Sequence, residues 1–232
     1  MASPFEFSYV FTVIGKIWEA MPVTLLLTFA PLFIGFLFGV PFAVIRRFNV
    51  PFAASFLKNA SNILKGIPAV LLVLMINYLI LKPIDYLALS YEWAKPLQTM
   101  NKIYIGIAAL SIYAVVQITE TVLGALLSVG KGQYEAAKIL GYTKAQTFIR
   151  IILPQVIKRI LPAITNETIT LVKDTSLAFT IGVTEMFTMA KALASGQVSM
   201  LPYAFAALFY YILNLVVAFI MERIEKKMNY YR

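Results

Sequence analysis

The stretch EAAKILGYTKAQTFIRIILP, residues 135–154, is a polar and charged segment between two long apolar runs. Ala136 and Ala137 combine high helix propensity with little bulk, so a helix here could approach another protein closely. We expect Glu135 at the start of that helix, where its charge would complement the helix dipole. Gly141 can adopt the left-handed conformation that ends a helix, and Thr143 can cap the next one. The segment is therefore predicted to be a helix–turn–helix elbow.

The composition places this elbow in a membrane protein. The 232-residue chain is 60% hydrophobic and 13% charged, with a mean hydropathy of +0.80, whereas about a quarter of the residues in soluble domains are charged. Its net charge of +9 fits the cytoplasmic Lys and Arg of the positive-inside rule and requires no nucleic acid. The absence of Cys and His excludes disulfides, thiol catalysis and Cys/His zinc sites. The N-terminus shows no removable signal sequence, so the first spanning segment is expected to direct insertion.

Runs of about 20 apolar residues predict membrane-spanning helices. We predict about five: 21–45, 66–81 with a backward extension over 59–64, 103–129, 160–185 and 192–221. The span over 160–185 is expected to be discontinuous, because charged residues interrupt it. Residues 82–101 are expected to form an external loop. Leu201-Pro202 marks the predicted start of the last helix, and 222–232 is a predicted basic, exposed tail.

The distribution of basic residues sets the orientation. An N-terminus outside and a cytoplasmic C-terminus place the basic residues that flank the spans on the cytoplasmic side. These residues are Arg46, Arg47, Lys131, Lys138, Lys144, Arg150, Arg223, Lys226 and Lys227. Because the sequence shows no domain linker, residues 1–232 are expected to form one integral-membrane domain.

The elbow and its surroundings resemble one known family. Glu135-Ala136-Ala137, Gly141, Ile151 and Leu153-Pro154 match the EAA motif, E-A-A-x3-G-x9-I-x-L-P, of ABC-importer permeases. Further stretches are similar to those of polar amino-acid ABC importer permeases: 128–137 to SVPKGQWEAA, 166–178 to NE…LLKDTSLA, 181–186 to IGVPEL and 65–68 to R-G-T-P. Two features depart from the pattern: Ile67 replaces the usual Thr, and the Arg usually found in the A-E-x-x-R-G pattern is missing from 119–124.

The resemblance implies an all-α integral membrane protein like the type I ABC importer permeases. The coupling segment, about 130–155, would contact a separate ABC ATPase subunit that carries ATP and Mg. Its contact residues would be Glu135, Ala136, Ala137, Gly141, Leu153 and Pro154. The chain would have no catalytic residue, metal or cofactor of its own, in agreement with the absence of a G-x-x-x-x-G-K-[ST] phosphate loop. Further implied partners are a second permease subunit, identical or similar, and an extracellular solute-binding protein in a bacterial plasma membrane.

Ionisable residues inside a span usually mark a transport path. Glu167 and Asp174 are seven residues apart, so on a helix they share a face with Thr170, whereas Lys173 points elsewhere. A site that presents both positive and negative side chains suits a zwitterion such as an amino acid. The predicted path residues are Gly66, Ile67, Pro68, Glu167, Thr170, Lys173, Asp174, Thr175 and Ser176. A buried ion pair or a subunit contact remains an alternative for Glu167 and Asp174.

Two other functions compete with the importer. Glu167, Lys173 and Asp174 could be the coupling residues of an ion-driven secondary carrier, although the inverted repeats typical of that class are not found. The chain could also be a membrane assembly or channel protein without a transport cycle. Glu120, which lies shortly before the elbow, is interpreted as an interfacial structural residue.

Overall fold

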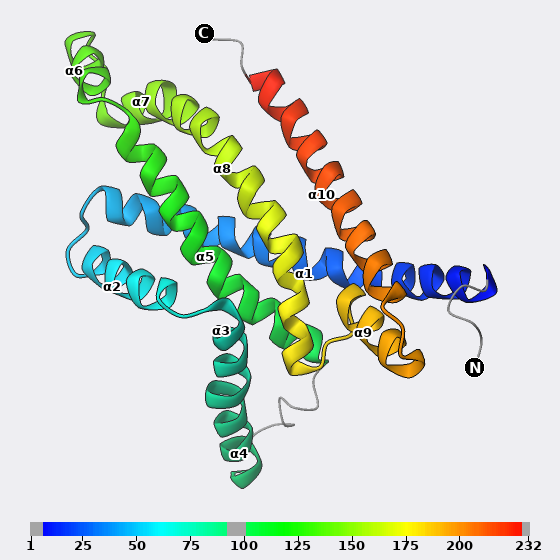
Figure 1. The fold of residues 1–232 in the computed structure, drawn as a ribbon. Coiled ribbons are helices and arrows are strands. Elements are labelled where there is room, and N and C mark those ends of the chain that lie inside the picture. Colours follow the sequence, from blue (N-terminus) through cyan, green and yellow to red (C-terminus); the bar gives the residue numbers. More distant parts are fainter. Residues whose placement is uncertain (1–6, 92–100, 229–232) are drawn as a thin grey trace.

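The computed structural model describes residues 7–91 and 101–228, and in this part of the chain the regular elements are all helical. Figure 1 shows long helices crossing one another, with α6 and α7 together at one end. The elements are α1 (Phe7–Arg47), α2 (Ala53–Lys65), α3 (Ala69–Met75), the π-helical η1 (Ile76–Leu81), α4 (Lys82–Ser90), α5 (Lys102–Ser128), α6 (Lys131–Ile139), α7 (Lys144–Thr147), the π-helical η3 (Phe148–Ile152), α8 (Leu153–Asp174), the 3-10 helix η4 (Thr175–Ile181), α9 (Met186–Gln197) and α10 (Leu201–Met228).

Four helical stretches in the described residues are long and apolar enough to cross a membrane: Phe7–Arg47, Ala69–Ser90, Lys102–Ser128 and Leu201–Met228. The expected fifth span falls on α8, whose 22 residues are about 33 Å long. Its composition is too charged for that criterion, but α8 packs against α1, α5 and α10. Neighbouring helices can shield its polar groups, and α8 as a fifth span stays a prediction.

The prediction for the second span was wrong in its boundaries. Residues 59–64 belong to the separate helix α2, and the span runs over Ala69–Ser90. The segment from Lys82, which was predicted to be a loop, begins with the helix α4. Its charges are accommodated within the fold: Asp85 is buried, and the Lys82 ammonium lies 4.1 Å from the ring centre of Tyr78. The rest of the predicted external loop, 92–100, lies outside the described residues.

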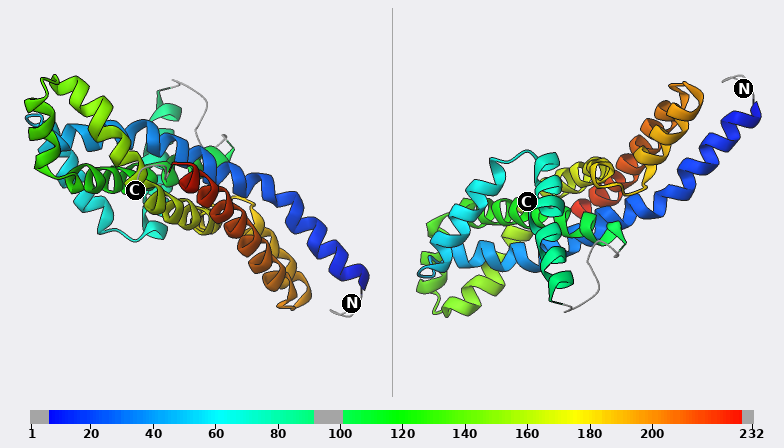
Figure 2. Two further views of the ribbon diagram at one scale, coloured as in Figure 1. Left: turned by 90° about the horizontal axis from the view of Figure 1, so that it is seen from above. Right: turned by 90° about the horizontal axis from the view of Figure 1, so that it is seen from below.

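Two glycines let α1 and α5 approach closely. A Cβ on Gly35 would lie 2.7 Å from the side chain of Ile118, and one on Gly39 would lie 3.0 Å from the carbonyl oxygen of Val115. Small residues at such crossings allow close van der Waals contact between spanning helices. The first span is also much longer than predicted, because α1 begins at Phe7 and not near residue 21. Its N-terminal part runs beside α9 and α10 (Figure 2).

The last helix begins at Leu201, as predicted. Helix α10 remains helical to Met228, and residues 222–227 of the predicted tail are exposed along its last turns, as expected. Met221, near the end of α10, packs against the apolar cluster that contains Val129 and Ile152 on either side of the elbow. The basic ends of α1 and α10 therefore lie at the same end of the molecule as the elbow, as the charge pattern predicted.

Candidate functional site

The elbow is a helix–turn–helix whose turn is closed by its own backbone. The Tyr142 amide donates to the Ala137 carbonyl at 3.0 Å, and the Gly141 amide donates to that of Lys138 at 3.1 Å. This is the Schellman arrangement, and Gly141 has the required positive φ of 77°. Thr143 then caps α7: its side chain accepts from the Gln146 amide at 3.2 Å, while the Gln146 side chain accepts from the Thr143 amide at 2.9 Å. The predicted left-handed turn at Gly141 and the predicted cap by Thr143 are confirmed.

The position predicted for Glu135 within its helix was wrong. Helix α6 begins at Lys131, so Glu135 is its fifth residue, outside the first turn. Its side chain is exposed, and so is that of Ala136, whereas Ala137 is buried. The tip beyond them presents Ile139 and Leu140, which are 86% and 73% exposed. Exposed apolar side chains gathered beside an exposed carboxylate are typical of a protein-binding surface.

Both ends of the elbow are fixed to the helix bundle. Arg159 of α8 donates to the carbonyl and the hydroxyl oxygen of Ser128, the last residue of α5. The side-chain amide of Gln155 donates to the side-chain oxygen of Gln133 in α6 at 3.2 Å. Leu153 begins α8 as its first residue, and Pro154 follows within its first turn, where no backbone donor is needed. The elbow is therefore connected to α5 and α8 at both of its ends.

A second cluster of polar side chains lies between α5 and α8, away from the elbow. Glu167 and Asp174 of α8 are half-buried and lie close enough to Tyr113 of α5 to act electrostatically on its hydroxyl. The side-chain amide of Gln117 donates to the Tyr113 hydroxyl at 2.9 Å. Within the described residues, neither carboxylate has a salt-bridge partner within 4.0 Å. Lys173 acts electrostatically on Asp174. Half-buried carboxylates that no cation contacts directly are costly, which makes this cluster a candidate site for a cationic ligand.

The remaining predicted path residues do not all gather there. Lys173 lines a cavity of about 540 Å³ on the other side of α8, together with Tyr210 and Asn214. Thr175 is buried and donates to the Val172 carbonyl, and the hydroxyl of Ser176 donates to that of Lys173. Gly66, Ile67 and Pro68 interrupt the helix between α2 and α3, as expected. Ile67 packs against the same apolar cluster as Tyr113.

Comparison with known proteins places this arrangement in a family. Residues 32–230 match the model of the binding-protein-dependent transport system inner membrane component. The chain belongs to this family. It is 30% identical to the probable amino-acid permease protein YxeN of Bacillus subtilis over 97% of this chain and 96% of the relative. It is 28% identical to the glutamine transport system permease protein GlnP of Escherichia coli over 97% and 98% of the two chains.

Solved structures show the same fold. The permease superposes with a TM-score of 0.81 on a structure described as an amino acid ABC transporter with histidines, at 24% identity and over 98% and 100% of the two chains. The methionine ABC transporter MetNI gives a TM-score of 0.72 at 21% identity. As an inner membrane component, this permease is a multi-pass protein of the bacterial plasma membrane. It is not an enzyme, because the ATPase activity of such importers resides in a separate subunit.

Several polar residues of the permease have structural partners that local patterns did not indicate. Tyr113 lies in an apolar run, and the packing of α5 against α8 brings it within electrostatic reach of the two carboxylates. Glu185, which sequence analysis did not single out as a site residue, is fully buried. It accepts hydrogen bonds from Thr24 and Tyr210 and caps α9 through the Thr188 amide. A carboxylate preceding a helical run, three residues before Thr188, was the available signal for that cap.

Proposed function

We propose that this permease forms one half of a translocation path for a polar amino acid or a close derivative. The observation that carries the proposal is the pair of half-buried carboxylates, Glu167 and Asp174, which act electrostatically on Tyr113 and have no salt-bridge partner within 4.0 Å among the described residues. The names of the relatives, an amino-acid permease and a glutamine permease, support the substrate class. In this proposal the whole of 1–232 acts as one transmembrane domain, from which about 130–155 projects as the coupling segment.

The chemistry of the site suits an α-amino group or a basic side chain. A protonated amine would satisfy Glu167 and Asp174 in turn as it passes, while Tyr113 and Gln117 offer hydrogen bonds to neutral polar groups. Thr170 lies on the same helix between the two carboxylates and is half-buried. Gly66-Ile67-Pro68 borders the path from α2, because non-helical backbone at membrane depth belongs beside protein or a watery cavity. Lys173, near the end of α8, and Ser176, in η4, would shape the outer end of the path from the cavity that they line, with the buried Thr175 between them in the chain.

Coupling in this proposal runs through the elbow. Glu135 would pair with a cation on an ABC ATPase subunit that binds ATP and Mg, while Ile139 and Leu140 would enter an apolar cleft beside it. Ala136 and Ala137 allow the close approach, Gly141 makes the turn, and Leu153-Pro154 carries the displacement into α8. A second permease subunit, identical or similar, would supply the other half of the path, and an extracellular binding protein would deliver the solute.

The test is uptake into proteoliposomes that contain the permease, its ATPase and any second permease, with the binding protein added outside. Labelled polar amino acids would be screened with ATP inside or absent. The expected result is uptake of one amino-acid class that requires ATP. Uptake that ignores ATP and follows an ion gradient would contradict the proposal.

A further inference from the structure

The helix break at Gly66-Ile67-Pro68 is held from one side by its own backbone. The Gly66 amide donates to the Asn62 and Ile63 carbonyls, and the Ile67 amide donates to that of Leu64. Pro68, with φ −54° and ψ 137°, then starts α3 in a new direction, as Figure 1 shows. Lys65 is the last residue of α2, directly before the break. Whatever fixes Lys65 therefore fixes the position of the break.

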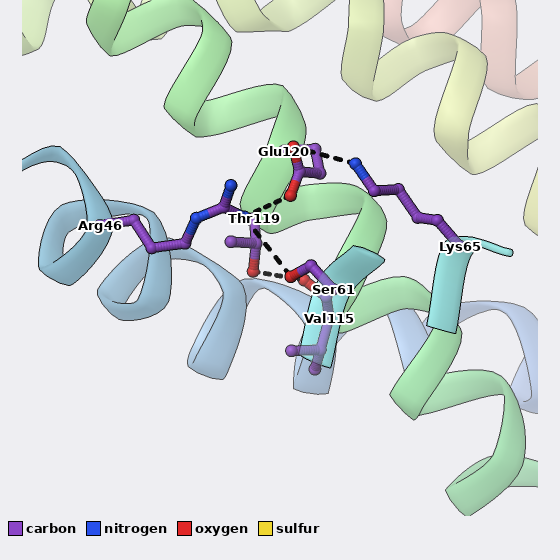
Figure 3. A network of polar contacts seen from close by, with 6 residues as sticks. All are labelled: Arg46, Ser61, Lys65, Val115, Thr119 and Glu120. Atoms are coloured by element: carbon purple, nitrogen blue, oxygen red, sulfur yellow. Dashed lines mark hydrogen bonds and ion pairs between the residues drawn. The ribbon is translucent and has the colours of Figure 1, made fainter. Parts of the chain in front are cut away.

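Polar contacts help to hold α2 against the bundle, in addition to the packing of Leu64 on the apolar core. Of its thirteen residues, all of which are described, Ser61 is the buried one. Ser61 accepts a hydrogen bond from Arg46 of α1 at 3.4 Å. The Lys65 ammonium lies 3.1 Å from the carboxylate of Glu120 on α5. Figure 3 shows these residues converging from three helices.

Glu120 is the centre of this network. One of its carboxylate oxygens pairs with Arg46 and the other with Lys65, so a single negative charge separates two cations. The Arg46 side chain is only 10% exposed, and its charge would be poorly solvated without the carboxylate. Neutralising Glu120 would leave two like charges near each other, and their repulsion would push α2 away from α1 and α5.

Glu120 is connected to the elbow through the helix α5. From Glu120, α5 runs without interruption to Ser128, eight residues or about 12 Å further on. Ser128 is bonded to Arg159 of α8, and α6 begins three residues later. A displacement of the elbow therefore moves Glu120 with α5, and Glu120 holds the residue that precedes the break.

We propose that Glu120 is a positioning residue that carries the movement of the coupling segment to the helix break at Gly66-Ile67-Pro68. This inference rests on the proposed function, in which that break borders the solute path. It replaces the interpretation of Glu120 as a merely interfacial residue. It also gives Lys65 a role as the partner through which α2 follows α5.

A single thiol reports whether the break moves. The chain contains no cysteine, so Ala69→Cys, in the first residue of α3, introduces the only thiol of the permease. Its rate of reaction with a charged methanethiosulfonate would be measured in the assembled transporter, with and without Mg-ATP and vanadate. Uptake and ATP hydrolysis would be measured on the same preparations.

In the Ala69→Cys permease we expect ATP to change the reaction rate. With Glu120→Gln added, we expect that change to vanish and the solute transported per ATP to fall about fivefold, which lies within the range of coupling effects along such connections. A full ATP response in the Glu120→Gln variant would overturn the inference. So would a rate that ignores ATP in the parent while its uptake still requires ATP, an outcome that leaves the proposed function intact.

Substitutions of Lys65 provide a second, independent test. Lys65→Met keeps the pairing of Arg46 with Glu120, and therefore tests the link to α2 even where Glu120→Gln prevents assembly with the ATPase. We expect Lys65→Met to lower transport per ATP as Glu120→Gln does, the double variant to be no worse than either single one, and Lys65→Arg to retain coupling. Normal coupling in Lys65→Met would overturn the inference. Glu222→Gln, which removes the exposed pair with Lys226 in α10, is the matched control and should leave coupling unchanged.

Discussion

Thr24 and Glu185 lie 161 positions apart in the chain, yet both side chains are fully buried and share a hydrogen bond of 3.3 Å. The hydroxyl of Thr24 also accepts from the Met186 amide at 3.2 Å. Tyr210 donates to the same carboxylate and contacts Thr175 just after α8. One buried carboxylate thus connects α1, α9, α10 and the end of α8.

Glu185→Ala is expected to destabilise the permease by about 2–4 kcal/mol, because it removes a helix cap and leaves buried donors without an acceptor. Glu185→Gln should cost less, since one acceptor oxygen remains. Thermal unfolding of the purified protein in detergent measures both. An alanine variant as stable as the parent would show that the buried hydrogen bonds contribute nothing.

The crossing of α1 and α5 offers a pair of opposite substitutions. Gly39→Ala would place a methyl group 3.0 Å from the Val115 carbonyl oxygen and from Ile118, and overpacking of this kind costs about 1–3 kcal/mol. Gly124→Ala, on α5 with no heavy atom within 4 Å of the added Cβ, should be neutral or stabilise by about 0.5–1 kcal/mol. Equal effects on thermal unfolding would argue against close contact of the two helices.

The turn of the elbow can be tested in the same way. Gly141→Ala forces a side chain into a left-handed conformation, at a cost of about 1 kcal/mol, and should weaken binding of the ATPase. Gly132→Ala, in the same elbow but without a positive φ and with open space around it, is the control. Co-purification of the ATPase with each variant gives the readout. Identical binding would show that the turn geometry does not matter for docking.

The site prediction rests on the two carboxylates of α8. Asp174→Asn and Glu167→Gln are each expected to raise the solute concentration needed for half-maximal uptake by about tenfold, equivalent to about 1.4 kcal/mol, without loss of assembly. Competition between labelled and unlabelled amino acids would show whether selectivity changes. An unchanged uptake profile combined with poor assembly would identify these residues as a subunit contact instead.

The elbow could be predicted from sequence because its determinants are local. A glycine at the turn and a threonine–glutamine cap act within a few residues, and Gly141, Thr143 and Gln146 occupy the positions that this geometry requires. Glu135 was misplaced because the helix extends four residues upstream, over Lys131 to Tyr134, where no marked cap precedes it.

Local charge was misleading for the second span. Lys82 and Asp85 suggested a loop, but a tyrosine ring accommodates the lysine and burial in the fold accommodates the aspartate. The partners of Glu120, and the contacts of Glu185 with Thr24 and Tyr210, could not be predicted, because these contacts join helices that are distant in the chain. Such pairings depend on which helix faces are in contact, and hydropathy does not contain that information.

The central claim, that the elbow transmits ATP-driven motion, is tested most directly by reversing the charge of Glu135. ATP-dependent uptake and ATP hydrolysis would be compared for the parent transporter and for Glu135→Lys, with membrane insertion of the permease verified in both. The account predicts that Glu135→Lys inserts normally but loses uptake, through uncoupled hydrolysis or loss of the ATPase. Normal ATP-dependent uptake by Glu135→Lys would contradict it.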